Sequence, residues 1–303
     1  MKKNFKFIVA GVSIAVLAAC TNYGDGSGAS GKNESVILIE ESFKPLFETS
    51  IDTFEGQFPK YDIAPSYLPE GEIIEKFYTG DYKTICISRQ LTSKELSDLK
   101  KKQIEVRSDK VAIEGIALIT HPENKDSLIT VGQLKRILNG TDTLWPQLKT
   151  RINVVFDQEN SANFYYLKNL CKLKKLPINV FAVKGNQQVI DYVKKNKSAI
   201  GIIGVNWISD ADDFDALAFL NGITVMSVSK DGKNEFLKPY ASYLFSQDYP
   251  LSREIWMINF AGRSSVFSSF VNFMIGEKGQ LIVQKSALVP ANAPIRLIQL
   301  DEE

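Results

Sequence analysis

The chain has 303 residues and a hydrophobic fraction of 44%, which is enough apolar material for full globular cores. Its formal charge of +1 gives no indication of the strongly basic surface that a nucleic-acid-binding protein needs. A single histidine excludes a histidine-rich metal site, and three cysteines are too few for a disulfide framework.

The N-terminal segment predicts export and lipid anchoring. Lysines at the start precede an apolar run from Phe7 to Leu17, which is too short to span a bilayer, and Leu17-Ala18-Ala19-Cys20 has the form of a bacterial lipobox. We therefore predict a lipoprotein signal peptide over residues 1–20 with Cys20 as the lipidation site. An ordinary signal peptide or an uncleaved anchor is the alternative.

Residues 21–34 are polar and glycine-rich, so they predict a flexible tether. Loss of the lysines of the signal would leave the mature chain close to neutral. The expected location is the cell envelope, with the protein held to the membrane by lipid and the periplasmic side favoured.

After the tether, short strands alternate with helices, as in parallel α/β proteins. The first three predicted strands are Val36–Ile39, Tyr61–Ser66 and Thr84–Ile87. Phe43, Phe47, Ile51 and Phe54 recur at helical spacing after the first strand. Thr92 and Glu95 form a capping-box pattern that opens the helix after the third strand.

Two long apolar segments, Val111–Ile119 and Tyr249–Asn259, predict strands that cross between two lobes. The predicted lobe I comprises residues 35–116 and 255–303, and lobe II comprises residues 117–254. Lobe II repeats the alternation, with a second capping box at Thr130 and Gln133. The expected fold is thus α/β and two-lobed, with two hinge crossings and an interlobe cleft, and we expect a monomer.

Three predicted strand-to-helix junctions carry small polar or cationic residues. At the carboxyl ends of strands, free N–H groups at helix N-termini favour an anion. The candidate ligand-binding residues at these junctions are Ser42, Phe43, Ser88, Arg89, Ser161, Ala162 and Asn163. Ordinary helix capping is the alternative for the hydroxyls, and a structural ion pair is the alternative for Arg89.

The other polar residues carry weaker signals. His121, beside a proline, predicts a turn residue rather than a catalyst, so a Ser-His-Asp hydrolase has one poor candidate base. The acidic segment 210–215 lacks the glycine and terminal glutamate of an EF-hand and predicts a solvated loop.

Cys86 and Cys171 are expected to be buried and separate, with a disulfide as the alternative. No metal, cofactor or enzymatic activity is predicted.

Several segments together resemble the phosphate-binding proteins of ABC importers, which have the type 2 periplasmic-binding fold. They are Val111–Asn124, Leu134–Gly140 with Trp145, Ala199–Gly204, Tyr249–Arg253, and Gly279–Val283 with Leu288-Val289-Pro290. The resemblance runs from about Ser35 to the C-terminus. It implies that Ser42 and Phe43 contribute a hydroxyl and an N–H group to phosphate.

The chain departs from that family at two junctions. The family has a Ser-Asp pair where this sequence has Ser88-Arg89, and it has Arg-x-x-x-Ser-Gly-Thr where this sequence has Asp157 to Asn163. The resemblance implies capture of a small oxyanion, with inorganic phosphate expected, and delivery to the membrane subunits of an ABC importer. The alternative is an envelope lipoprotein that uses the same fold for protein interaction or signalling without solute transport.

Overall fold

A computed structural model describes residues 36–173, 176–233 and 235–292. These residues belong to one compact unit, Asn33–Glu303. The predicted signal peptide, Cys20 and the predicted tether lie outside the described residues. Among the helices that the structure describes, none is both long and apolar enough to cross a membrane.

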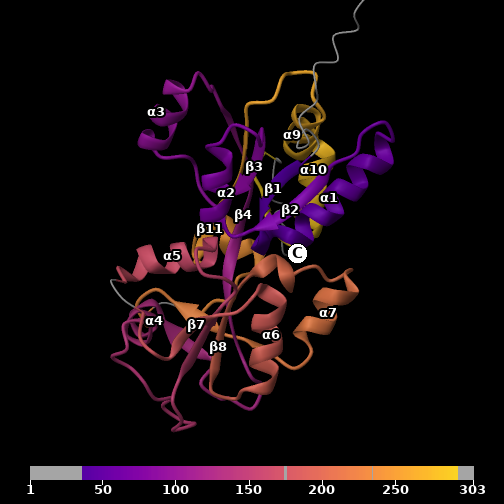
Figure 1. Cartoon of the computed structure of the whole chain (residues 1–303). Helices are drawn as coiled ribbons and strands as arrows, with labels where there is room; N and C mark the ends of the chain where they lie inside the picture. The colour runs from indigo at the N-terminus through magenta and orange to yellow at the C-terminus, as the bar shows by residue number, and fades with distance from the viewer. Residues whose placement is uncertain (1–35, 174–175, 234, 293–303) are drawn as a thin grey trace, which may run out of the picture. The chain divides into compact units, whose positions relative to one another are not determined.

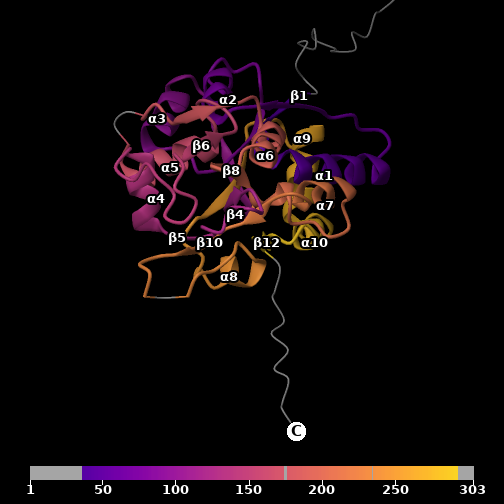
Figure 2. The same cartoon turned by 90° about the horizontal axis from the view of Figure 1, so that it is seen from below.

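The described residues form an α/β fold around one large sheet with strand order β2-β1-β3-β11-β4-β8-β6-β7. The strands are β1 Val36–Glu40, β2 Ala64–Leu68, β3 Thr84–Ile87, β4 Arg107–Thr120, β5 Leu128–Thr130, β6 Asn153–Phe156, β7 Val180–Ala182, β8 Ala199–Gly204, β9 Thr224–Val225, β10 Ser227–Ser229, β11 Ser252–Asn259 and β12 Val289–Pro290. β9 and β12 also pair with β4, whereas β5 and β10 form a separate ribbon beside α8 (Ala241–Phe245), as Figure 2 shows.

We call lobe I the half built on β1, β2 and β3, and lobe II the half built on β6, β7 and β8. The helices of lobe I are α1 Lys44–Gln57, α2 Glu70–Phe77, α3 Ser93–Lys101, α9 Val266–Ile275 and α10 Glu277–Lys285. The helices of lobe II are α4 Val131–Leu138, α5 Ala162–Cys171, α6 Asn186–Lys195 and α7 Phe214–Leu220. Figure 1 shows the two groups of helices at opposite ends of β4. Short 3-10 turns, Glu41–Phe43 (η1) and Val205–Trp207 (η2), follow β1 and β8.

Strand β4 joins the two lobes. Its residues up to Gly115 pair with β11 on the lobe I side, and from Ile116 onward they pair with β8. The predicted boundaries at 116/117 and 254/255 stay predictions. β4 is longer than the predicted Val111–Ile119, because Asp109 and Lys110 are polar residues that nevertheless pair with Met257 and Trp256 of β11.

Local sequence signals explain most helix starts. Both predicted capping boxes are confirmed, since Thr92 accepts from the N–H of Glu95 and Thr130 accepts from the N–H of Gln133. The prediction for β2 was wrong by three residues at its start, because pairing with β1 begins only at Ala64, opposite Val36.

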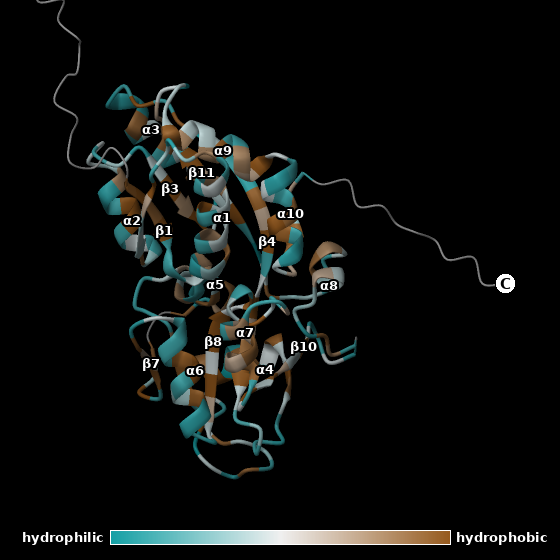
Figure 3. Cartoon of the chain, turned by 90° about the vertical axis from the view of Figure 1, so that its right-hand side faces the viewer, coloured by the Kyte–Doolittle hydropathy of each residue, from teal (hydrophilic) through white to brown (hydrophobic). Residues whose placement is uncertain are grey.

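Buried apolar side chains form three clusters, one of which includes residues of both lobes, and Figure 3 shows hydrophobic colour concentrated on strands such as β3 and β8. A cluster that includes Phe47 and Phe270 lies between α1, α9 and the sheet. Cys86 and Cys171 are both buried and free.

Candidate functional site

The first polar junction is built at the end of β1, the strand that supplies Glu40. The chain turns there into η1, and the carboxylate of Glu40 accepts the N–H of Ser42 at 2.9 Å and also the hydroxyl of Ser42. Glu40 and Ser42 are both fully buried. A buried carboxylate is tolerated only where donors surround it, and η1 supplies two of them.

The second side of this carboxylate faces lobe II. Oε1 of Glu40 accepts the N–H of Ala162, the first residue of α5, at 3.1 Å. Ser161 caps the same helix, because its Oγ accepts the N–H of Phe164 at 3.1 Å. The carboxylate of Glu40 therefore joins a strand end in lobe I to a helix N-terminus in lobe II, where the backbone dipole favours negative charge.

Asp157 lies at the end of β6 and holds the polar side chains around the start of α5. Its carboxylate accepts the hydroxyl of Ser161 at 2.6 Å and the amide of Asn163 at 2.9 Å. Asn186, at the start of α6, donates to the same carboxylate at 3.3 Å. The candidate residues Ser161 and Asn163 are thus occupied by a carboxylate of their own chain.

A guanidinium enters this region from β11. Arg253 lies directly opposite Glu114 of β4, and its Nε donates to Glu114 at 2.8 Å, while its Nη2 donates to Ser42 Oγ at 2.8 Å. The side chain of Arg253 is 2% exposed and that of Glu114 is fully buried. The guanidinium also stacks on the ring of Phe43 at 4.9 Å. Its Nη1 is buried without a hydrogen-bond partner among the described residues.

We call these buried residues the polar cluster: Glu40, Ser42, Glu114, Asp157, Ser161 and Arg253. Burial, and then the nearby charge of Asp157, raises the pKa of Glu40 to about 8. Burial likewise raises the pKa of Glu114 and of Asp157, although the guanidinium of Arg253 opposes the rise. The cluster thus sets one cation against three carboxyl groups, and protonation of Glu40 lowers the repulsion among them.

A fourth carboxylate, that of Glu41, binds lobe II next to Glu40. Glu41 accepts the N–H of Asn186 at 3.3 Å and the side-chain amide of Asn186 at 2.6 Å. Burial raises the pKa of Glu41 to about 7, with the charge of Asp157 as the second cause. Glu40 and Glu41 therefore each bind the N-terminus of a lobe II helix from the same turn of lobe I.

Ser88 and Arg89 lie at a different carboxylate, that of Glu70. Glu70 accepts the N–H of Ser88 at 2.8 Å, its hydroxyl at 2.5 Å and the Nε of Arg89 at 3.1 Å. The remaining face of the guanidinium binds Glu95 at 2.8 and 2.9 Å. These residues line a cavity of about 750 Å³ that α5 closes with Tyr165 and Tyr166.

The structure therefore brings five candidate residues together and places two elsewhere. Ser42, Phe43, Ser161, Ala162 and Asn163 meet in or beside the polar cluster, whereas Ser88 and Arg89 meet at Glu70. Direct contact of any of the seven with an anion stays a prediction.

Sequence analysis missed Glu40, Glu114 and Arg253. Each is a charged residue beside apolar residues within or at the end of a strand, namely β1, β4 and β11. Charged side chains are almost never fully buried unless they are paired, so a charge inside an apolar strand was an available signal. Such a charge indicates a buried partner, but the sequence does not show which residue the partner is.

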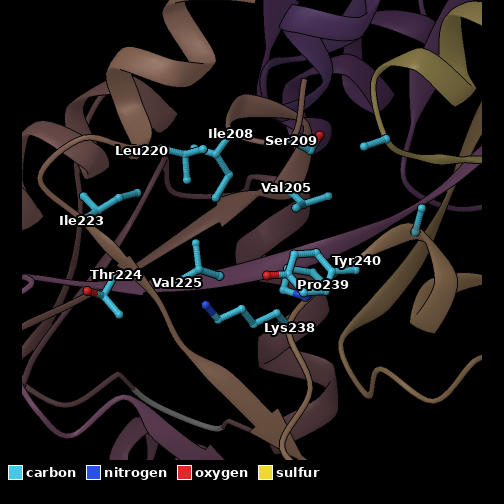
Figure 4. Close-up of a pocket in the computed structure, with 12 residues that line it drawn as sticks. Val205, Ile208, Ser209, Leu220, Ile223, Thr224, Val225, Lys238, Pro239 and Tyr240 are labelled. Carbon is cyan, nitrogen blue, oxygen red and sulfur yellow. The ribbon is translucent and has the colours of Figure 1, made fainter. Parts of the chain in front are cut away.

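A separate cavity of about 450 Å³ lies beside η2 and β9 and is drawn in Figure 4. Lys238 supplies its one cationic side chain among the described residues, and most of the other lining is aliphatic. Figure 4 shows Val205, Ile208 and Val225 on its walls. Apolar walls do not replace the water around a small oxyanion, so the polar cluster remains the candidate anion site.

The described residues contain no group of three or more histidine, cysteine or acidic side chains placed to hold a metal ion. His121 lies in a turn, where its Nδ1 accepts the N–H of Glu123 at 3.1 Å. This is the turn role that the sequence predicts. The chemistry of the site therefore rests on N–H groups, hydroxyls, carboxylates and one guanidinium.

Comparisons with known proteins agree with this architecture. A family model described as a PBP superfamily domain matches residues 28–278. The phosphate-binding protein PstS of Staphylococcus aureus (strain USA300) is 23% identical over 299 residues, which cover 95% of this chain and 88% of that protein.

Solved structures share the fold. A phosphate ABC transporter substrate-binding protein from Clostridium perfringens, solved with bound phosphate, is 23% identical with a TM-score of 0.71, over 84% of this chain and 98% of that chain. An ABC-type phosphate transport receptor from Vibrio cholerae is 18% identical with a TM-score of 0.64, over 84% and 99% of the two chains. The comparisons confirm the family resemblance and the two-lobed α/β fold that the sequence predicts.

Proposed function

The chain belongs to the PBP superfamily, and from this premise we propose that it captures a small oxyanion, inorganic phosphate, between its lobes and delivers it to the membrane subunits of an ABC importer. One observation carries the proposal. The N–H of Ser42, the hydroxyl of Ser42 and the N–H of Ala162 already converge on a pair of carboxylate oxygens. Donors from both lobes thus converge on two oxygens of one anion. A bound oxyanion that holds the cleft closed would need the same arrangement of donors.

The proposed mechanism is binding without a covalent step. Separation of the lobes at the strands β4 and β11 would expose the donor groups of Ser42 and Ala162 to water. Closure would then bring the N-terminus of α5 onto an anion held at Ser42, with Arg253 as the charged donor. The names of the relatives support phosphate as the anion.

Calorimetry tests the proposal directly. A chain that begins at Asn33 contains the whole compact unit, so it is a fair sample of the binding protein. After removal of carried-over ligand, we expect it to bind inorganic phosphate at a ratio of one to one. Lack of any saturable heat at millimolar phosphate would reject the proposal, and saturable heat with sulfate alone would keep the site but change the anion.

A protein-interaction role is the second candidate, and one observation favours it. The donors of Ser42, Ala162 and Ser88 are all taken by carboxylates of the same chain. A lipoprotein that had lost solute binding would keep such internal pairs permanently. The same calorimetry separates the two, because an interaction protein of this kind would give no heat with phosphate.

We propose that the protein is held at the outer face of a membrane by lipid on Cys20. The support is the lipobox pattern Leu17–Cys20 after a short apolar run. We expect Cys20→Ser to abolish labelling of the protein by a palmitate analogue in cells, since the thiol is the acylated group. Labelling of the variant equal to that of the wild type would contradict the anchor, and Cys171→Ser serves as the control for loss of a thiol.

A further inference from the structure

We propose that the side chain of Glu40 is an internal ligand of the oxyanion site, and that phosphate binds by displacing it from the N–H groups of Ser42 and Ala162. The inference rests on the proposed function, because it assumes that these donors bind phosphate. It makes Glu40 a residue that sets affinity by competing with the solute.

The contacts of Glu40 are those that an interlobe anion would make. One of its oxygens takes the N–H and hydroxyl of Ser42, from lobe I, and the other takes the N–H of Ala162, from lobe II. A phosphate bound to the same donors would have two of its oxygens at these positions. The two ligands therefore exclude each other, since each N–H group donates to one of them at a time.

Charge adds to this exclusion where Glu40 is ionised, above its pKa, which burial raises to about 8. Asp157 and Glu114 are fully buried in the same cluster, and Arg253 is the cation that faces them. A phosphate added to this set without movement of Glu40 would place a fourth acidic group around one guanidinium. At the low dielectric of a buried site, that repulsion is far stronger than in water.

A second, independent observation indicates that the cluster is built for one more acceptor. Nη1 of Arg253 is buried and has no hydrogen-bond partner among the described residues. An unsatisfied donor on a buried charged group is costly, and such groups are normally paired. Nη2 of the same guanidinium already donates to Ser42 Oγ, so an acceptor that Ser42 binds would lie close to Nη1.

The arrangement also explains how the lobes stay together without solute. Glu40 reaches from β1 to the start of α5, and Glu41 reaches from η1 to the start of α6. The N–H of Gly71 in α2 adds a bond to the carbonyl of Asn160 at 3.0 Å. Closure is thus stabilised by carboxylates of the chain in the positions that a bound anion would use.

The exchange is tested with Glu40→Gln and Glu40→Ala in the chain that begins at Asn33. If the internal ligand occupies the donors about 90% of the time, its removal tightens phosphate binding about tenfold. We expect a gain of at least that size for Glu40→Ala and a smaller gain for Glu40→Gln, whose amide oxygen still accepts. Glu48→Gln, which removes one exposed carboxylate from α1, is the matched control and should leave the affinity unchanged.

The outcomes separate the inference from the proposed function. Measurable phosphate binding by the wild type together with tighter binding by Glu40→Ala would support the exchange. Weaker binding by both variants would overturn it, because Glu40 would then be a ligand of the bound anion. Equal affinity of wild type and Glu40→Ala would overturn the exchange alone, and no binding by any of the proteins would overturn the proposed function as well.

Discussion

Arg253→Met is expected to destabilise the protein by about 3–5 kcal/mol, the range for breaking a buried ion pair by removing one partner. The guanidinium is the charged partner of Glu114, and both side chains are almost completely buried. Its loss leaves Glu114 as an uncompensated buried carboxylate and removes a donor to Ser42. Thermal and urea unfolding of the variant and of the wild type measure the effect.

A double replacement separates folding from binding at this position. In Arg253→Met with Glu114→Leu, the buried pair becomes apolar, a change that is often neutral or stabilising, so most of the stability should return. Phosphate affinity should not return, and we expect it to stay lower by about a hundredfold because the charged donor is still absent.

Arg107→Met, which removes a half-exposed guanidinium from the neighbouring strand β4, is the control and should change neither property appreciably. Recovery of phosphate affinity in the double variant would contradict the assignment of Arg253 to the anion site. Failure of the double variant to regain stability would instead contradict the account of Glu114 as an unpaired charge.

Glu40→Gln is expected to raise the melting temperature in alkaline solution and to leave it nearly unchanged in acid. The pKa of Glu40 is raised to about 8 in the folded chain, chiefly by burial, from an ordinary value of 4.5. In the folded protein the group keeps its proton where the unfolded chain has lost it. Its contribution is therefore fully present below pH 4.5 and is lost as the pH rises through about 8.

The neutral amide of the variant does not undergo this loss. We expect the melting temperature of Glu40→Gln to exceed that of the wild type by about 5 °C near pH 9 and by little near pH 4.5. Glu41, Glu114 and Asp157 also have raised pKa values and titrate in both proteins, so the difference between the two curves reports Glu40. A constant difference across the pH range would show that Glu40 has the same pKa in the folded and unfolded chains.

Sequence periodicity predicted several of the helices and strands, because their signals lie among nearby residues. Thr92 and Glu95, or Thr130 and Gln133, lie three positions apart, so a capping box is visible in a short window. The strand Thr84–Ile87 and the helix that follows Ser161 were also predicted from local composition, and the structure has both. Strand ends were less certain, since β2 begins where its partner β1 begins.

The sequence by itself determined the α/β alternation, the crossing strand β4 and the strand-end junctions at which polar groups gather. Only the tertiary structure decided which charges meet there. Glu40 and Ala162 are 122 positions apart, and Arg253 and Glu114 are 139 apart. No local pattern relates such pairs, because their contact depends on how the chain crosses between the lobes and on the register of β11 against β4. In this register the charged side chains are buried and therefore paired. A desolvated carboxylate is stable only beside hydrogen-bond donors, and the fold brings those donors to it.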